Sequence, residues 1–360
     1  MTTETSTNVN ITTSETLPEE HLTKFNSSIK IPYPDFRMNG SSDVKAIRIR
    51  STQNISVTVS VREDITTLIA TEKLGTSYII STPDNNFRFR VYAAITVTAL
   101  HDNTSITFSD LVDTTFPDYT LNALETRIHE YHGSGEKTYR IQSSKPVAVF
   151  SGMYCMSDEI CSNMVEQIPP YNQLDTVYII PPNYNRHGTL ARFLSLENTT
   201  ATYPNNETKT IIAGRQYGYL RRNQTIVIRS TDPILMTSYP LEELNSGKHN
   251  PYWTVVPGVN QYLPRYKIII PNGWNGNYIA LMIRRSAVGG LRVNEQSIDA
   301  NSIRFQENVF VEALEYSVII AEVSEDELTL DTIDDTPFGL MVYGSRPGAG
   351  YGFAGNVILR

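Results

Sequence analysis

Apolar residues along this chain recur in short runs that alternate with polar ones, the pattern of β-strands. Runs such as ISVTVSV, FRVYAAITVTAL and YSVIIAEV are rich in β-branched and aromatic side chains, and Pro, Gly, Asn or Asp bounds them. Helical spacing is rare, and LNALETRIHEYH (121–132) fits a helix or a pair of strands equally well. The pattern predicts an all-β fold that begins near Ile29.

The first 28 residues depart from this pattern. They are rich in Ser and Thr and poor in apolar residues, so they bury too little surface to offset the entropy of ordering, which predicts a flexible Ser/Thr-rich tail. They also lack the basic, apolar and small-residue succession of a signal peptide. No apolar run approaches the roughly 20 residues of a transmembrane helix, so we expect no membrane insertion.

A strand that ends in Ser, a turn and a second strand recur along the chain. Asn54, Pro146 and Pro233 hold the same place in IRSTQNISVTVSV, IQSSKPVAVFSGMY and IRSTDPILMTSYP, and Pro337 marks a fainter fourth copy. The repeat also contains a second similar segment, which occurs as LGTSYIISTP, LDTVYIIPP and LPRYKIIIP. A unit of about 90 residues has the size of one β-sandwich, and its period is long for a propeller blade. The sequence thus predicts tandem β-sandwich-like repeats, three to four related units with approximate bounds 29–137, 138–224 and 225–360.

The composition limits the kinds of partner that the protein could bind. The 360 residues are 40% hydrophobic, which is enough for a buried core, and the formal net charge is −8 at pH 7. An acidic protein repels phosphate backbones and anionic lipid surfaces, so we expect no nucleic-acid partner.

The two cysteines, Cys155 and Cys161, enclose a short acidic segment. Their C-x5-C spacing is neither the C-x2-C of structural zinc sites nor a C-x-x-C redox motif, and no His lies between them. A hairpin-like loop between two strands easily brings two cysteines within the about 7 Å that a disulfide requires. The spacing favours a disulfide over two free buried thiols, with metal binding or catalysis as weaker alternatives.

Asparagines in Asn-x-Ser/Thr sequons offer a second indication of an oxidising compartment, although a chain rich in Asn, Ser and Thr also produces sequons by chance. The candidate glycosylation sites are Asn10, Asn26, Asn39, Asn54, Asn103, Asn198, Asn206 and Asn223.

Motifs with specific chemistry are few. Gly350-Tyr-Gly352-Phe-Ala-Gly355 matches G-x-G-x-x-G, but no helix can follow it within the last five residues, so we interpret it as a turn between closing strands. His129 and His132 are three residues apart rather than the four of H-E-x-x-H, which favours exposed loop histidines.

The acidic segment SEDELTLDTIDD offers oxygen ligands that suit calcium, with Asp326, Asp331, Asp334 and Asp335 as candidates. The Gly and Glu of an EF-hand loop are missing, so a solvated acidic turn is the favoured interpretation and we expect no metal and no cofactor.

Several of these segments together resemble a known family. Several segments are similar to the N-terminal domain of the IgG Fc-binding protein family. They are KPVAVFSGMYC with MVEQIPP, then YIIPP, the Glu-Asn-Thr turn and IRSTDPILMTSYP. The closing FGLMVYGSRPGAGYGFAG is similar to the C-terminal signature of that domain. The resemblance spans roughly 29–360 and implies that Cys155 and Cys161 form the family's loop disulfide.

The family consists of secreted or cell-surface glycoproteins, often associated with mucus, so the resemblance implies binding or adhesion to extracellular glycoproteins or glycans such as mucins, without catalysis. The cysteine-rich von Willebrand D-type modules of longer relatives are missing, so gel formation is not implied. Tyr351 and Phe353 are candidates for an exposed contact patch, with packing under the final strand as the alternative.

Two other functions remain open. A carbohydrate-active β-sandwich enzyme would use paired carboxylates, with Glu166 and Glu197 as the candidates. A purely structural extracellular spacer would need neither a site nor a pocket.

Overall fold

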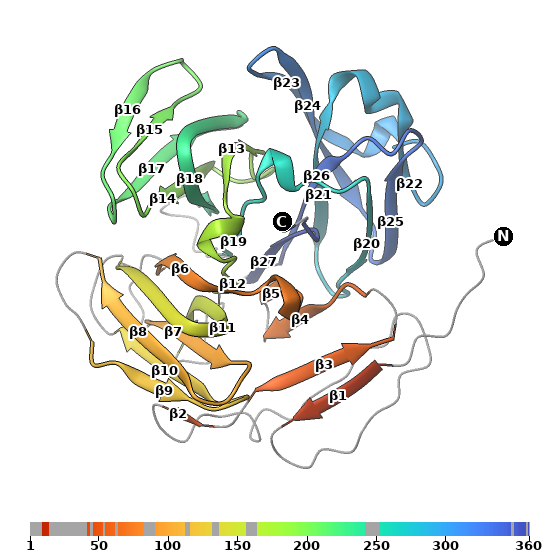
Figure 1. Ribbon diagram of the computed structural model, residues 1–360. Coiled ribbons are helices and arrows are strands. Elements are labelled where there is room, and N and C mark those ends of the chain that lie inside the picture. Colours follow the sequence, from red (N-terminus) through yellow and green to blue (C-terminus); the bar gives the residue numbers. More distant parts are fainter. Residues whose placement is uncertain are drawn as a thin grey trace.

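The structure is a computed structural model, which describes the β-rich body of the chain. The described residues are 9–13, 42–43, 46–52, 55–61, 64–82, 91–111, 116–131, 137–155, 164–241, 252–346, 349–357 and 359. Within these ranges the chain forms antiparallel strands and short 3-10 turns, and contains no α-helix. The predicted all-β class is therefore confirmed. Figure 1 shows the sheets arranged around a common centre.

The first sheet has eight strands and curls around one long strand, β11 (Thr138–Cys155). The first half of β11 pairs with β6 and β8, and its second half pairs with β7 and β12. The other strands of this sheet are β2 (Ser42–Asp43), β6 (Gly75–Ser81), β7 (Val91–Ala99), β8 (Thr104–Asp110), β9 (Tyr119–Leu121), β10 (Thr126–Tyr131) and β12 (Met164–Gln167).

The second sheet has seven strands and repeats this arrangement around β18 (Ile226–Leu241). The first part of β18 pairs with β13 and β15, and its second part pairs with β14 and β19. The other strands are β13 (Asp175–Ile180), β14 (Gly188–Leu194), β15 (Thr199–Thr202), β16 (Thr208–Ile211), β17 (Gln216–Arg221) and β19 (Thr254–Val255).

The C-terminal third contains two separate sheets. One has the order β20-β25-β22 and the other β23-β24-β21-β26-β27. Their strands are β20 (Arg265–Ile270), β21 (Gly276–Arg284), β22 (Leu291–Val293), β23 (Ile303–Val311), β24 (Leu314–Val323), β25 (Asp326–Thr332), β26 (Phe338–Arg346) and β27 (Ala349–Ala354).

The long strands correct one expectation. Turns were predicted at Pro146 and Pro233, but β11 and β18 continue through both residues. Proline has no backbone N–H, and the pairing of β11 with β6 shifts register between Gln142 and Val147. The proline therefore bends the strand rather than ending it, and the first two sheets form curled half-barrels instead of separate sandwich layers. Near Pro337 the chain does break, between β25 and β26.

Two small two-stranded sheets stand beside the large sheets. β1 (Val9–Thr13) pairs with β3 (Ile47–Ser51), and β4 (Thr58–Val61) pairs with β5 (Asp64–Thr67). The expected tail 1–28 is thus wrong for residues 9–13, because the alternating sequence VNITT supplies a strand that fits the edge of β3. The rest of that tail lies outside the described residues.

Two other local predictions are resolved. LNALETRIHEYH forms a strand pair, since β9 ends at Leu121 and β10 starts at Thr126. The glycine-rich segment at 350–355 is not the predicted turn: most of it belongs to β27, which pairs with β26. Glycine is required at Gly352, where an added Cβ would lie 2.2 Å from the ring of Tyr252.

Three short 3-10 turns lead into strands that each carry a buried tyrosine. The turns are η2 (Thr71–Lys73), η3 (Tyr171–Gln173) and η4 (Val259–Gln261), and the described residues also form the 3-10 turns η5 (Arg285–Gly290) and η6 (Ala300–Ser302). The Tyr178 hydroxyl accepts from the Asp175 N–H at 2.9 Å and donates to the Ile234 carbonyl at 2.6 Å. Tyr78 and Tyr266 make the equivalent two bonds. Each hydroxyl accepts from a backbone N–H three residues earlier and donates to a backbone carbonyl of a distant strand.

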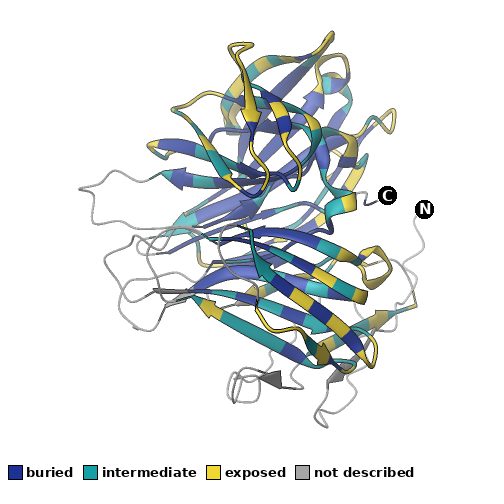
Figure 2. Cartoon of the chain, turned by 60° about the vertical axis from the view of Figure 1, so that its left-hand side comes forward, coloured by how far each residue is buried: buried dark blue, intermediate teal, exposed yellow. Residues whose placement is uncertain are grey.

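The core lies between the sheets, as the dark residues in Figure 2 show. One cluster fills the first half-barrel, one lies between the second half-barrel and the C-terminal strands, and one lies between the two C-terminal sheets. The short strands β5, β12 and β19 meet with β27 at the centre of the molecule (Figure 1). This meeting point positions the candidate site.

Candidate binding cavity

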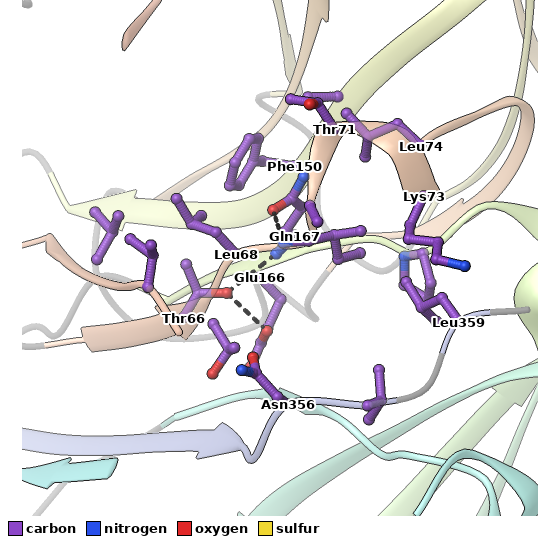
Figure 3. A pocket seen from close by; sticks show the side chains of 18 of the residues that line it. Thr66, Leu68, Thr71, Lys73, Leu74, Phe150, Glu166, Gln167, Asn356 and Leu359 are labelled. Carbon is purple, nitrogen blue, oxygen red and sulfur yellow. Dashed lines mark hydrogen bonds between the residues drawn. The ribbon is translucent and has the colours of Figure 1, made fainter. Parts of the chain in front are cut away.

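A cavity of about 1150 Å³ lies against the centre of the molecule. Its lining comes from β3, β5, η2, β7, β11, β12, and the residues around β19 and after β27. The inner wall carries the polar side chains of Thr66, Glu166 and Gln167 (Figure 3). Glu166 and Gln167 belong to MVEQIPP, one of the segments on which the resemblance noted above depends.

The three polar residues form a directed hydrogen-bond chain. The Gln167 N–H donates to Thr66 Oγ1 at 3.2 Å, and this hydroxyl donates to Glu166 Oε2 at 3.0 Å. Gln167 Oε1 in turn accepts from the Ile69 N–H at 2.8 Å. The chain fixes the Glu166 side chain between β5 and β12. Its other oxygen, Oε1, is buried and has no hydrogen-bond partner.

Asp64 stands beside Glu166 and is held by backbone groups. Asp64 Oδ2 accepts from the Val165 N–H at 2.6 Å and Oδ1 accepts from the Ile65 N–H at 2.9 Å. The Gly352 N–H also donates to this carboxyl, so Asp64 joins β5 to β12 and β27. Burial raises the pKa of Asp64 well above its usual value, and these three donors oppose the shift only in part.

Burial also raises the pKa of Glu166 well above its usual value, and the neighbouring Asp64 charge raises it further. Hydrogen bonds from the Thr66 hydroxyl and the Val255 N–H lower the pKa of Glu166 and so oppose this rise. None of the ion pairs between described residues involves Asp64 or Glu166. Two buried acids therefore share one site without a basic partner among these residues, and proton uptake relieves their repulsion.

We expect Glu166→Gln to stabilise the protein at neutral pH. The unfolded chain releases the Glu166 proton near the ordinary glutamate pKa, whereas the folded chain retains it at higher pH. Wild-type stability therefore falls as pH rises above about 4.5, while the amide variant lacks this contribution. Urea unfolding from pH 4 to 8 measures the difference. The exposed Glu197→Gln serves as control, and an E166Q variant less stable than wild type at pH 7 would contradict the assignment.

Apolar side chains surround this polar wall. Leu74 and Leu359 are buried, and Leu68 and Phe150 are half-buried on the same lining (Figure 3). The outer rim is exposed and charged, with Arg50, Glu72 and Lys73. The cavity thus runs from a charged rim along apolar walls to a buried carboxyl, which suits a ligand with an apolar body and one polar end.

The structure separates the predicted catalytic pair. Glu166 is buried in the cavity lining, but Glu197 lies exposed in the turn between β14 and β15 and does not line the cavity. Paired-carboxylate glycoside chemistry needs both carboxyls at one cleft, so this pair does not provide it. The carboxyl that does adjoin Glu166 belongs to Asp64.

The acidic candidates for calcium are also not brought together. Asp326 starts β25, while Asp334 and Asp335 lie in the turn beyond its other end. Asp331 lies across from Arg265 of β20, and Asp335 forms an ion pair with Arg265 at 3.0 Å. Among the described residues, no group of three or more His, Cys, Asp or Glu side chains could hold a metal ion. A strand places its ends too far apart for one shared cation.

Tyr351 and Phe353 do not form an exposed patch. They are 0% and 1% exposed, in β27, and the Tyr351 hydroxyl donates to Asn277 Oδ1 at 2.6 Å. The prediction of a contact surface there is wrong, because the strand pairs with β26 and covers the core. His129 is likewise no loop residue: it lies half-buried on β10 and stacks on Phe108 with ring centroids 3.9 Å apart. His132 lies outside the described residues.

The structure describes only some of the residues named in the cysteine and sequon predictions. Cys155 is the last residue of β11, opposite Val91, and Cys161 lies outside the described residues. Asn10 lies in β1, and Asn26, Asn39 and Asn54 lie outside the described residues. The remaining four sequon asparagines all occupy exposed turns: Asn103, Asn198, Asn206 and Asn223.

Asp64 and Thr66 were missed by the sequence analysis, although the sequence carries a signal for one of them. Thr66 and Glu166 each precede the buried tyrosine of their own segment, Tyr78 or Tyr178, by the same distance in sequence. Alignment of the tyrosine segments would have placed these two residues at equivalent positions. Nothing comparable singles out Asp64, whose equivalent by this spacing is Met164.

Comparison with known proteins identifies the family. Residues 64–344 match the family described as IgGFc binding protein, and this range contains Asp64, Thr66 and Glu166. No curated protein and no solved structure matches the chain significantly. Within the described residues, no helix is long and apolar enough to span a membrane. Because the match covers most of the sequence, the chain belongs to the IgGFc-binding protein family.

Proposed function

We propose that this chain is a non-enzymatic binding domain of a secreted or cell-surface glycoprotein that adheres to extracellular glycoproteins or glycans, mucins among them. The family match over residues 64–344 carries this proposal. Binding would use exposed turns and sheet edges rather than catalytic groups.

The positions of the sequons support an extracellular site. Asn103, Asn206 and Asn223 have positive φ values of 52°, 60° and 48° in exposed turns. Turn asparagines of this kind point outward and are accessible to a glycosylating enzyme. These three asparagines lie in turns between consecutive strands of the first two sheets.

A different aromatic residue replaces Tyr351 and Phe353 as the candidate contact. Phe310 is 66% exposed near the end of β23, and Leu314 is 45% exposed across the hairpin in β24. Aromatic side chains are enriched at protein interfaces, so the end of this hairpin is our candidate contact surface.

We also infer that the chain consists of related units, although the bounds proposed from sequence need adjustment. The shared hydrogen bonds of Tyr78, Tyr178 and Tyr266 support three units. Because β11 and β18 pair with strands that precede them, we place the unit boundaries after these long strands rather than at 137/138 and 224/225.

Mass spectrometry of the chain purified from its native source tests the compartment. We expect a disulfide between Cys155 and Cys161 and N-glycans on the four exposed turn asparagines, and each Asn→Gln substitution should remove one glycan. Free thiols and bare asparagines would contradict secretion.

Binding to an immobilised mucin-type glycoprotein, before and after glycan removal, tests adhesion. We expect binding to wild type and at least about fivefold weaker binding to Phe310→Ser, since truncation of an interface aromatic commonly costs more than 1 kcal/mol. The exposed Ile333→Ser serves as the matched control. A chain that is secreted and glycosylated but binds no glycoprotein would instead favour a structural spacer.

A further inference from the structure

We propose that the central cavity binds a primary amine carried on an apolar chain, with the ammonium group against Glu166 and the apolar chain along the cavity wall. This site is independent of the glycoprotein adhesion proposed above. The proposal depends on the geometry of Glu166, the charge of its surroundings and the chemistry of the walls.

The geometry provides one open acceptor. Thr66 Oγ1 receives the Gln167 N–H, so its own proton is free to point to Glu166 Oε2 at 3.0 Å. Glu166 is 5% exposed, and its Oε1 has no hydrogen-bond partner although it is buried. An unsatisfied buried carboxyl oxygen is costly, so the ionised form of Glu166 is suited to a ligand that donates a hydrogen bond to this oxygen.

The charge favours a cationic donor over a neutral one. Asp64 adds a second carboxyl beside Glu166, and neither forms an ion pair with a described basic side chain. Lys73 shares the cavity lining, but its ammonium group points away from Glu166 in Figure 3. A ligand ammonium would supply the counter-charge that the protein leaves out.

The walls favour an aliphatic body. Leu68, Leu74 and Leu359 line the space between the rim and Glu166, together with Phe150 (Figure 3). A strongly hydrated ion without an apolar part would gain nothing from these side chains. The cavity therefore selects amines with several methylene groups, either as free molecules or as the side chain of a lysine in a partner protein.

Proton release should accompany binding. Burial and the neighbouring Asp64 raise the pKa of Glu166 in the empty cavity, and the incoming ammonium favours the ionised carboxylate. The other titratable or charged groups on the lining are Arg48, Arg50, Glu72, Lys73 and Tyr178. Affinity for the amine should accordingly rise with pH until the amine itself loses its proton, near pH 10 for a lysine-like group.

Isothermal titration calorimetry at pH 7 with hexylammonium, hexan-1-ol and hexanoate tests the proposal. The three probes share the same chain length and differ in their polar end. We expect hexylammonium to bind at least about tenfold more tightly than hexanol, because only the ammonium pairs with the carboxylate, and hexanoate to bind most weakly. Titrations in two buffers of different ionisation enthalpy report the released proton.

Two matched variants complete the test. Glu166→Gln should reduce the preference for amine over alcohol to within about threefold while leaving the weak alcohol binding in place, since an uncharged amide gives the ammonium no counter-charge. Glu197→Gln, an identical change on an exposed turn, should leave the preference unchanged. Thermal unfolding confirms that both variants fold.

A second pair of probes distinguishes the two sources of the amine. Nα-acetyl-lysine methylamide and its norleucine analogue differ only in the ammonium group. A preference for the lysine compound would identify a partner's lysine side chain as a ligand, and a preference confined to hexylammonium would identify a free amine. Equal binding of amine and alcohol to wild type, an unchanged preference in E166Q, or no binding of any amine would overturn the proposal.

Discussion

Gly152→Ala is expected to lower the free energy of unfolding by about 3 kcal/mol. Gly152 of β11 lies opposite Val165 of β12 on one side and Ala94 of β7 on the other. A Cβ at this position would lie 2.1 Å from the backbone oxygen of Met164. Backbone cannot rotate away as a flexible side chain can, so β12 must shift relative to β11.

Chemical denaturation of the purified variant measures the loss. Gly289→Ala is the matched control, because an added Cβ there meets no atom within 4 Å. We expect the control to change stability by less than about 0.5 kcal/mol. Since Glu166 is two residues from Met164 on β12, the shift should also weaken amine binding at the cavity. A G152A variant as stable as wild type would show that the two strands have more freedom than the structure indicates.

The second large effect concerns the buried tyrosines. We expect Tyr178→Phe to lower the free energy of unfolding by about 2 to 3 kcal/mol, because the ring remains while two buried backbone groups lose their partner. These groups are the Asp175 N–H and the Ile234 carbonyl, 2.9 Å and 2.6 Å from the hydroxyl. The burial that creates this cost also raises the pKa of the phenol.

The same substitution at Tyr78 and Tyr266 should cost a similar amount, since each hydroxyl joins an N–H three residues earlier to the carbonyl that follows a proline. Tyr184→Phe is the control: this side chain is half-buried, and its bond to Tyr343 uses the backbone N–H. Urea titrations of the four variants should give three large losses and one small one. Unequal losses at the three sites would argue against equivalent roles.

Sequence pattern was sufficient for the fold class but not for sheet shape. Period-two alternation and β-branched residues identify strands wherever one face is buried, and ISVTVSV at 55–61 shows both. A proline in such a run signals an end, yet Pro146 sits where the register of β11 shifts and no ladder hydrogen bond is lost. Whether a strand bends or stops there depends on partners on both sides, which local sequence does not encode.

The site was only half predictable. Glu166 stands out because it lies in a distinctive motif, but its paired carboxyl was assigned to Glu197 when it belongs to Asp64. Asp64 is about 100 residues away in sequence, and only the meeting of β5 with β12 brings the two together. Burial, which changes the behaviour of both acids, is likewise a property of the assembled sheets.

The shared strands β11 and β18 have a mechanical consequence for the protein. Each one is bonded on both of its halves to different neighbours, so shear applied to one part of a half-barrel is transmitted along a continuous backbone to the rest. Shear along such a strand requires many hydrogen bonds to rupture together, whereas peeling would break them one after another. Each half-barrel would therefore resist such a force as a whole until it yields in a single step.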